Sequence, residues 1–225
     1  MIFWVERGEN ITMAYSKFTA RDLKKIFGVE EVFQTNVLSN IPPRQASEWL
    51  KTSLSHGVEL ALAQDTEKSR SELIISPIFV ELRNQAEKKI SIFSGVEFNV
   101  DRNLKLTGEC DFLVSRSAYQ SVLEAPVMVA VEAKRQDFEK GYAQCIAEMI
   151  AIRIFNEREG KPSEKIYGCV TTGDIWRFLI LSANEAIIEA TAFDVREDLE
   201  RILGVLWAMT FDEIAVAHSL NREML

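Results

Sequence analysis

Cysteine and histidine are scarce in this chain of 225 residues, which has three of the first and two of the second. Cys110, Cys145 and Cys169 form no C-x-x-C pair, so we expect buried, reduced thiols and no disulfide framework. His56 and His218 are too few and too far apart for a zinc site. These shortages argue against a zinc centre and leave a Cys–His nucleophile without support.

Long apolar runs are also missing. The longest runs have the length of a strand, well short of the roughly 20 residues that a membrane-spanning helix needs. Residues 1–5 carry no basic side chain and are followed by Glu6, Arg7 and Glu9, which does not indicate a secretory signal. Hydrophobic residues at 47% and charged residues at 27% are typical of a soluble globular protein. We expect a cytoplasmic protein that does not bind membranes.

Positive charge is in deficit, because 34 Asp and Glu residues outnumber 26 Lys and Arg residues and give a formal net charge of -8. Nonspecific binding to duplex DNA depends on neutralising phosphates with Lys and Arg. The total charge therefore weighs against a strong nonspecific DNA binder. It is compatible with an enzyme whose acidic side chains hold a divalent cation, since the cation and a local basic rim supply positive charge at the site.

The most informative stretch is VMVAVEAK, from Val127 to Lys134, an apolar run of strand length that ends in two charges. Such a run predicts a strand buried on both faces. Residues two apart on a strand share a face, so Glu132 and Lys134 project together and Ala133 points away. Charges at the edge of a core are costly unless partners or a metal compensate them. A compensating group is therefore expected nearby.

A second acid precedes this strand. Residues 104–114, LKLTGECDFLV, predict another strand in which Asp111 stands among apolar residues. Residues 89–100 alternate around Gly95 and predict a strand that pairs with it as a hairpin. We expect Asp111 to lie beside the charged end of the 127–134 strand.

Taken together, these residues resemble a known superfamily. Asp111, a gap of twenty residues, the triplet from Glu132 to Lys134 at a strand end, and a following amphipathic helix that contains Gln144 are similar to the PD-(D/E)xK, or restriction-endonuclease-like, nucleases. The resemblance covers residues 59–182. It is nearest to uncharacterised bacterial proteins similar to the N-terminal nuclease domain of type I restriction subunits. The Pro of the nominal motif is missing before Asp111.

The resemblance implies both a fold and a chemistry. The implied fold is a restriction-endonuclease-like α/β core with a central mixed sheet of four to six strands flanked by helices. Asp111, Glu132 and the carbonyl group of Ala133 would hold Mg2+ or Mn2+, ions that prefer hard oxygen ligands. Lys134 would act as catalytic base or stabilise the transition state, and Gln144 would support the site.

The superfamily also places a Glu on its first helix, and two acids qualify here. A helical pattern covers residues 58–85, with a kink or break expected at Pro77. Stepping by 3.6 residues places Glu67 on the side that faces the sheet and Glu72 toward the flank, beside Lys68. We favour Glu67. Glu72 stays open because a kink at Pro77 would change the rotation of either segment.

The remaining pattern completes the predicted organisation. Residues 1–57 are expected to form an N-terminal helical extension packed on the core, and residues 58–225 a nuclease-like α/β domain with C-terminal helices at 195–225. The other expected elements are a helix at 139–156, antiparallel strands at 165–171 and 176–181, and an edge strand at 186–193. The 139–156 helix is the one long crossover, so we expect its two flanking strands to be parallel.

The predicted site is compatible with three functions. The first is a Mg2+- or Mn2+-dependent nuclease that hydrolyses DNA phosphodiester bonds in restriction or repair, with RNA as a possible substrate and a homodimer as a possible assembly. The alternative is a nuclease-like module that no longer cuts and serves binding or assembly, which the acidic total charge favours. The third is a structural domain whose charges form a buried salt-bridge cluster without metal affinity.

Overall fold

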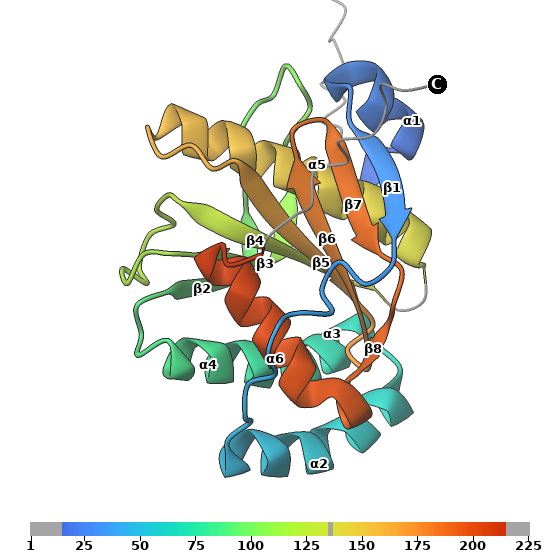
Figure 1. The fold of residues 1–225 in the computed structure, drawn as a ribbon, viewed down its shortest axis with the longest axis vertical. Helices are drawn as coiled ribbons and strands as arrows, with labels where there is room; N and C mark the ends of the chain where they lie inside the picture. The colour runs from blue at the N-terminus through green and yellow to red at the C-terminus, as the bar shows by residue number, and fades with distance from the viewer. Residues whose placement is uncertain (1–14, 135–136, 215–225) are drawn as a thin grey trace, which may run out of the picture.

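The protein folds into a central mixed sheet flanked by helices (Figure 1). The computed structural model describes residues 15–134 and 137–214. The eight strands are β1 (Glu30–Gln34), β2 (Ser91–Glu97), β3 (Glu109–Ser115), β4 (Val127–Ala133), β5 (Lys165–Thr171), β6 (Ile175–Ser182), β7 (Glu185–Glu189) and β8 (Phe193–Asp194). Their order is β1-β7-β6-β5-β4-β3-β2, and β8 pairs with β6. The predicted α/β class is thus confirmed, with a larger sheet than expected.

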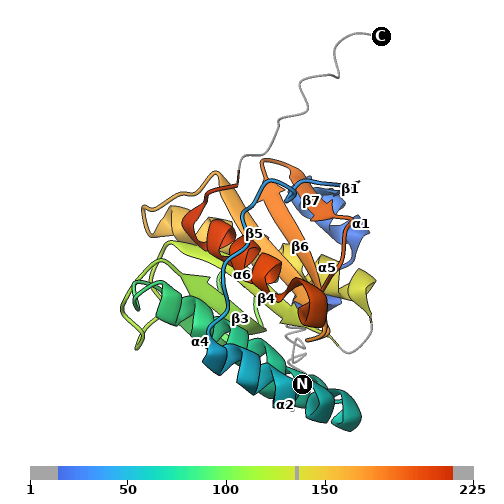
Figure 2. The same ribbon diagram turned by 60° about the horizontal axis from the view of Figure 1, so that its bottom comes forward.

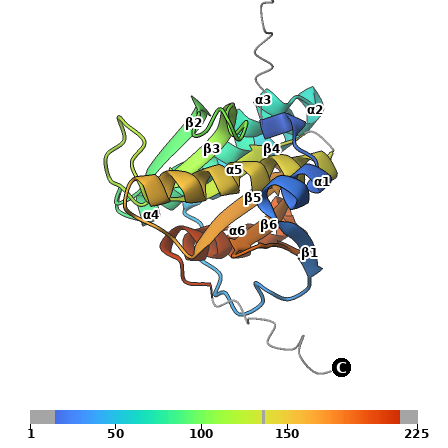
Figure 3. The ribbon, with the colours of Figure 1, turned by 90° about the horizontal axis from the view of Figure 1, so that it is seen from above.

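Helices cover both faces of this sheet. The α-helices are α1 (Ala20–Asp22), α2 (Glu48–Gln64), α3 (Glu67–Arg70), α4 (Ser76–Gln85), α5 (Phe138–Arg158) and α6 (Val195–Phe211), and the shorter turns are η1 (Tyr15–Lys17), η2 (Leu23–Phe27) and η3 (Ser71–Ile75). One core lies between the sheet and α5, together with η1 and η2. The other core lies between the sheet and α2, α4 and α6 (Figures 2 and 3).

The strand pairing around β4 agrees with the sequence. All seven residues of β4 are buried, as an apolar run between two helical layers requires. β2 and β3 form the expected antiparallel hairpin, and β3 is antiparallel to β4. β4 and β5 are parallel and are joined through α5, while β5 and β6 are antiparallel. The strands before and after the α5 crossover, β4 and β5, are therefore parallel neighbours, as the sequence predicts.

The N-terminal segment differs from the expected helical extension. Thr19 does begin a short helix through a capping box with Asp22, but residues 30–34 then form β1. This strand pairs in parallel with β7, so β7 is not the edge strand. Two of the five residues in its sequence EEVFQ are charged, and the pairing with β7 rather than local propensity makes it a strand.

The helical region 58–85 contains a second break besides the junction predicted at Pro77. α2 begins earlier, at Glu48, and runs through Gly57, where a Cβ would lie 2.5 Å from the Leu73 carbonyl oxygen. The helix ends at Asp65, which has a left-handed φ of 50°, and Thr66 caps α3. Pro77 lies in the first turn of α4 directly after the wide turn η3. Because Pro lacks an N–H, that first turn is a position it tolerates.

The C-terminal helix and the cysteines agree with expectation. α6 covers residues 195–211 of the C-terminal helices predicted at 195–225. Residues 215–225 of that prediction lie outside the described part of the chain. Cys110, Cys145 and Cys169 are buried free thiols. None of the helices described is both long and apolar enough to cross a membrane.

Candidate active site

Glu132 and Lys134 project together from the end of β4, as the strand period predicts. Glu132 is only 2% exposed, and its carboxylate forms an ion pair with the Lys134 ammonium group. The backbone N–H of Lys134 donates to the Thr171 carbonyl oxygen at 2.8 Å, which fixes the end of β4 against β5. A buried carboxylate is thus paired with a partly exposed cation at the edge of the core.

Asp111 reaches the same strand end from β3. Its Oδ2 accepts a hydrogen bond of 2.7 Å from the Ala133 N–H. The N–H and C=O groups of one strand residue point to the same side of the strand, so the Ala133 carbonyl also faces the Asp111 side. Asp111 and Glu132 repel each other electrostatically. The two acids and the Ala133 carbonyl therefore converge.

Gln144 of α5 joins these groups into one network. Its Oε1 accepts from Lys134 Nζ at 3.1 Å, and its Nε2 donates to Glu132 Oε2 at 2.6 Å. α5 approaches the sheet closely because Gly141 lies above Val170, where a Cβ would meet Val170 Cγ1 at 2.6 Å. A small residue at this position lets Gln144 reach the buried strand end.

The structure also separates the two candidate acids of the first helix. Glu67 begins α3, and its charge acts on both Asp111 and Lys134. Glu72 lies in η3 and forms an exposed ion pair of 2.9 Å with Lys68, as predicted for the flank. Of the two, Glu67 is the acid whose charge reaches the site.

Arg70 holds α3 in place beside the β5–β6 turn. Its side chain is 10% exposed and pairs with Asp65 at 3.1 Å and Asp174 at 2.9 Å. It also donates to the Thr172 carbonyl oxygen at 2.5 Å. These contacts fix Glu67 three residues before Arg70, so a buried arginine positions the helix that carries the acid.

Glu148 is a further member of the site that the sequence reading missed. It is fully buried, one turn after Gln144 on α5, and its Oε1 accepts from Gln144 Nε2 at 3.2 Å. Its Oε2 has no hydrogen-bond donor among the described residues when both acids are ionised. A proton on Glu148 supplies the missing donor, and the Glu148 carboxyl then hydrogen-bonds Glu132.

Burial governs the protonation of these acids. Burial, followed by repulsion from Asp111, raises the pKa of Glu132 to about 7 against the opposing effect of Lys134. Burial, followed by repulsion from Glu132, raises the pKa of Glu148 well above its usual range. Burial also raises the pKa of Asp111, although the Ala133 N–H and Lys134 lower it. For Lys134, burial lowers the pKa, but Glu132 and Asp111 outweigh it and the net shift is upward.

The raised acid pKa values predict a pH-dependent stability in the metal-free protein. The folded state holds protons on Glu132 that the unfolded chain releases near pH 4.5, so this contribution is lost as pH rises through about 7. We expect the free energy of unfolding, measured by urea titration in EDTA, to fall between pH 5 and pH 8. Glu132→Gln should reduce this slope, and the buried Glu148, whose pKa is also raised, should keep the remainder.

A matched control for that slope is Glu87→Gln. Lys89 lowers the pKa of the exposed Glu87 side chain, so its titration lies below this pH window. The control should keep the slope of the unaltered protein. An equal slope in Glu132→Gln would show that Glu132 does not carry the effect.

The donor set suits a hard divalent cation, although it is small. Two carboxylates that repel each other and a backbone carbonyl are the oxygen ligands that Mg2+ and Mn2+ use, with water completing the octahedron. Within residues 15–134 and 137–214, no three His, Cys, Asp or Glu side chains are arranged to hold a metal. Asp111, Glu132 and the Ala133 carbonyl would hold such an ion with two side-chain acids and one backbone oxygen, and Mg2+ is usually bound through one or two carboxylates.

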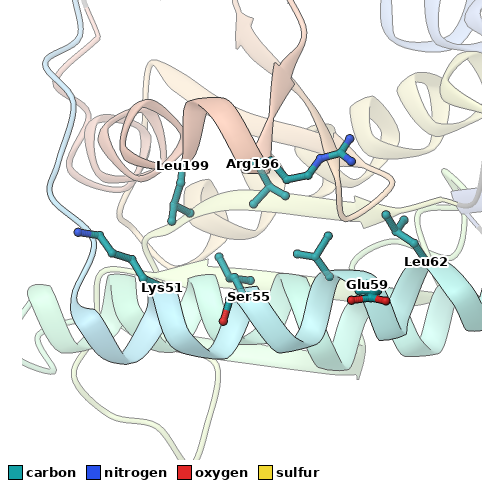
Figure 4. A pocket seen from close by; sticks show the side chains of 9 residues that line it. Lys51, Ser55, Glu59, Leu62, Arg196 and Leu199 are labelled. Atoms are coloured by element: carbon teal, nitrogen blue, oxygen red, sulfur yellow. The ribbon is translucent and has the colours of Figure 1, made fainter.

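A groove elsewhere on the molecule is separate from this site. It lies between α2 and α6, has a volume of about 550 Å³, and is lined mainly by apolar side chains with Lys51, Glu59 and Arg196 at its rim (Figure 4). None of its lining residues belongs to the network around Glu132.

Comparison with known proteins adds no assignment. The chain matches no protein-family model and no curated protein.

Proposed function

We propose that this protein is a metal-dependent nuclease that hydrolyses DNA phosphodiester bonds. The observation that carries the proposal is the convergence of Asp111, Glu132 and Lys134 at the end of β4, with Gln144 bound to two of them. The resemblance to the PD-(D/E)xK superfamily belongs to the same proposal. Restriction and repair are both compatible with this site.

The placement of the two acids, Asp111 and Glu132, favours binding of a cation. Glu132 and Asp111 are kept close in a largely buried position at a cost in free energy, because burial and mutual repulsion disfavour both charges. Functional sites often keep such costly arrangements. A bound Mg2+ would repay the cost, lower the pKa of water and neutralise negative charge on the phosphate.

The other residues of the network position the reacting groups and compensate their charge. Lys134 carries the cationic group of the network, and it would stabilise the charge that builds on the scissile phosphate or orient the attacking water. Gln144 keeps the Lys134 and Glu132 side chains aligned through its two hydrogen bonds. Glu148, neutral and buried, supports Gln144 and Glu132 from behind.

A plasmid-nicking assay tests the proposal. We expect supercoiled DNA to be nicked or linearised in Mg2+ or Mn2+ and to stay intact when EDTA removes the metal, because the two acids need the cation to act on a phosphate. Single-stranded DNA and RNA should be assayed in parallel to define the substrate. Absence of cleavage of every substrate in both metals would contradict the proposal.

The non-cutting alternative predicts a different result in the same experiment. A binding or assembly module would bind a metal or nucleic acid without cutting it. The specific observation in its favour is that both Glu132 oxygens are engaged, one by Lys134 and one by Gln144. Calorimetric titration with Mn2+ beside the nicking assay therefore separates a silent site from an active one.

A further inference from the structure

A second group of side chains lies beside the candidate active site, on the other flank of α5. Glu132, Val170 and Arg177 are direct neighbours on β4, β5 and β6, so their side chains share one face of the sheet. At normal strand spacing, Arg177 is roughly 10 Å from Glu132 between backbones. Gly141 of α5 lies over Val170, between the two. Only the first turns of α5 separate Arg177 from the acids.

Three aromatic rings form a row of contacts that leads to Arg177. Phe138 and Tyr142 lie one turn apart on α5 with ring centroids 6.2 Å apart. Phe33 of the edge strand β1 meets Tyr142 edge-on at 5.9 Å, and the Arg177 guanidinium lies 5.9 Å from the Phe138 ring centroid. We name these four residues, Phe33, Phe138, Tyr142 and Arg177, the aromatic shelf.

Core packing does not account for the whole of the aromatic shelf. Phe33 is 59% exposed, so much of its ring contributes nothing to the core. Arg177 Nη1 donates to the Ala190 carbonyl oxygen, but its Nε is enclosed without a hydrogen-bond partner among the described residues. An exposed ring that is linked through Tyr142 and Phe138 to a guanidinium group suits a ligand with a flat face and an anionic group.

The charges around the aromatic shelf limit the class of ligand further. Glu31 and Glu139 act electrostatically on Tyr142 and on each other, so acids border the aromatic shelf. Duplex binding needs many phosphate contacts, which these acids and the net charge of -8 disfavour. Unpaired bases can instead stack on aromatic rings and need few phosphate contacts.

We propose that the aromatic shelf binds an unpaired strand of nucleic acid, with a base stacked on Phe33 and a phosphate held by Arg177. The inference rests on the proposed nuclease function and deepens it, because it names single-stranded nucleic acid as the substrate class.

The test measures binding apart from cleavage. Fluorescence anisotropy of a short labelled oligothymidylate is recorded in Mg2+ on a Lys134→Ala background, with the matching duplex as a second ligand. We expect Phe33→Ala to weaken single-strand binding about 10-fold or more and to leave the weaker duplex binding unchanged. Phe33→Tyr should restore the affinity because it keeps the ring. Arg177→Lys should weaken binding several-fold, since Lys lacks the planar fork.

The matched control is Trp49→Ala, which removes a 50% exposed ring from α2. It should leave single-strand affinity unchanged. With Lys134 intact, Phe33→Ala should raise KM for a single-stranded substrate and leave kcat unchanged, because the ring lies away from the reacting atoms. Melting temperatures of all variants are measured alongside.

The outcomes separate this inference from the proposed function. Single-strand affinity that survives both Phe33→Ala and Arg177→Lys, or that Phe33→Tyr fails to restore, overturns the aromatic shelf even if the protein cuts DNA. Affinity that depends on Phe33 in a protein that cuts nothing supports the aromatic shelf and contradicts the nuclease. No measurable single-strand binding overturns the aromatic shelf.

Discussion

Replacing Lys134 by alanine is expected to abolish metal-dependent DNA cleavage, with a loss in kcat of at least about 100-fold. The reason is that Lys134 is the cation of the network, paired with Glu132 and bound to Gln144 at 3.1 Å. Its side chain is 21% exposed, so it can leave Glu132 and act on a phosphate. The measurement is the rate of plasmid nicking at saturating Mg2+, with circular dichroism to check the fold.

The matched control for this substitution is Lys140→Ala. Lys140 lies in the first turn of α5, and its exposed ammonium group pairs with Asp137 at 3.1 Å. This variant should cut at the rate of the unaltered protein, and much of the Mn2+ affinity should persist in Lys134→Ala because Asp111 and Glu132 are intact. Undiminished cleavage by Lys134→Ala would remove Lys134 from the catalytic machinery.

Asp111→Asn is expected to have opposite effects on affinity and stability. Loss of one of two carboxylates should weaken Mn2+ binding by roughly 100-fold or more and end cleavage, because ligand carboxylates matter at least as much as their supporting groups. The metal-free protein should become more stable, since the neutral amide ends the repulsion with Glu132 and keeps an acceptor for the Ala133 N–H. A gain of about 1 kcal/mol would raise Tm by about 2–4 °C.

This pair of effects distinguishes a working site from a structural salt-bridge cluster. If the charges at the end of β4 served stability alone, Asp111→Asn would destabilise the protein or leave it unchanged, and calorimetry would detect no Mn2+ binding to either form. Glu72→Gln is the control for a lost carboxylate, because Glu72 is exposed and paired with Lys68. It should retain both metal affinity and cleavage.

The candidate site was largely predictable because its signals are local. An apolar run that ends in Glu-x-Lys fixes the shared face of Glu132 and Lys134 through the strand period alone. Asp111 could be placed because its strand directly precedes β4 in an antiparallel arrangement. Helical phase also separated Glu67 from Glu72, and the junction expected at Pro77 lies where η3 meets α4.

The residues and elements that could not be predicted from the sequence depend on tertiary contacts. Glu148 looks like an ordinary helix acid, since Glu is a common surface residue, and the signal that could have found it is its position one turn after Gln144 beside the apolar stripe of α5. β1 was missed because its sequence, with two charged residues in five, becomes a strand only by pairing with β7. Phe33 was overlooked for the same reason.

The most direct test of the central claim is a crystal structure of the protein soaked in Mn2+, with anomalous scattering used to locate the ion. We expect one peak at the end of β4, bonded to a carboxylate oxygen of Asp111 and one of Glu132, with Lys134 displaced from Glu132. A map without such a peak, in which Asp111 still accepts from the Ala133 N–H and Glu132 still pairs with Lys134, would contradict the account.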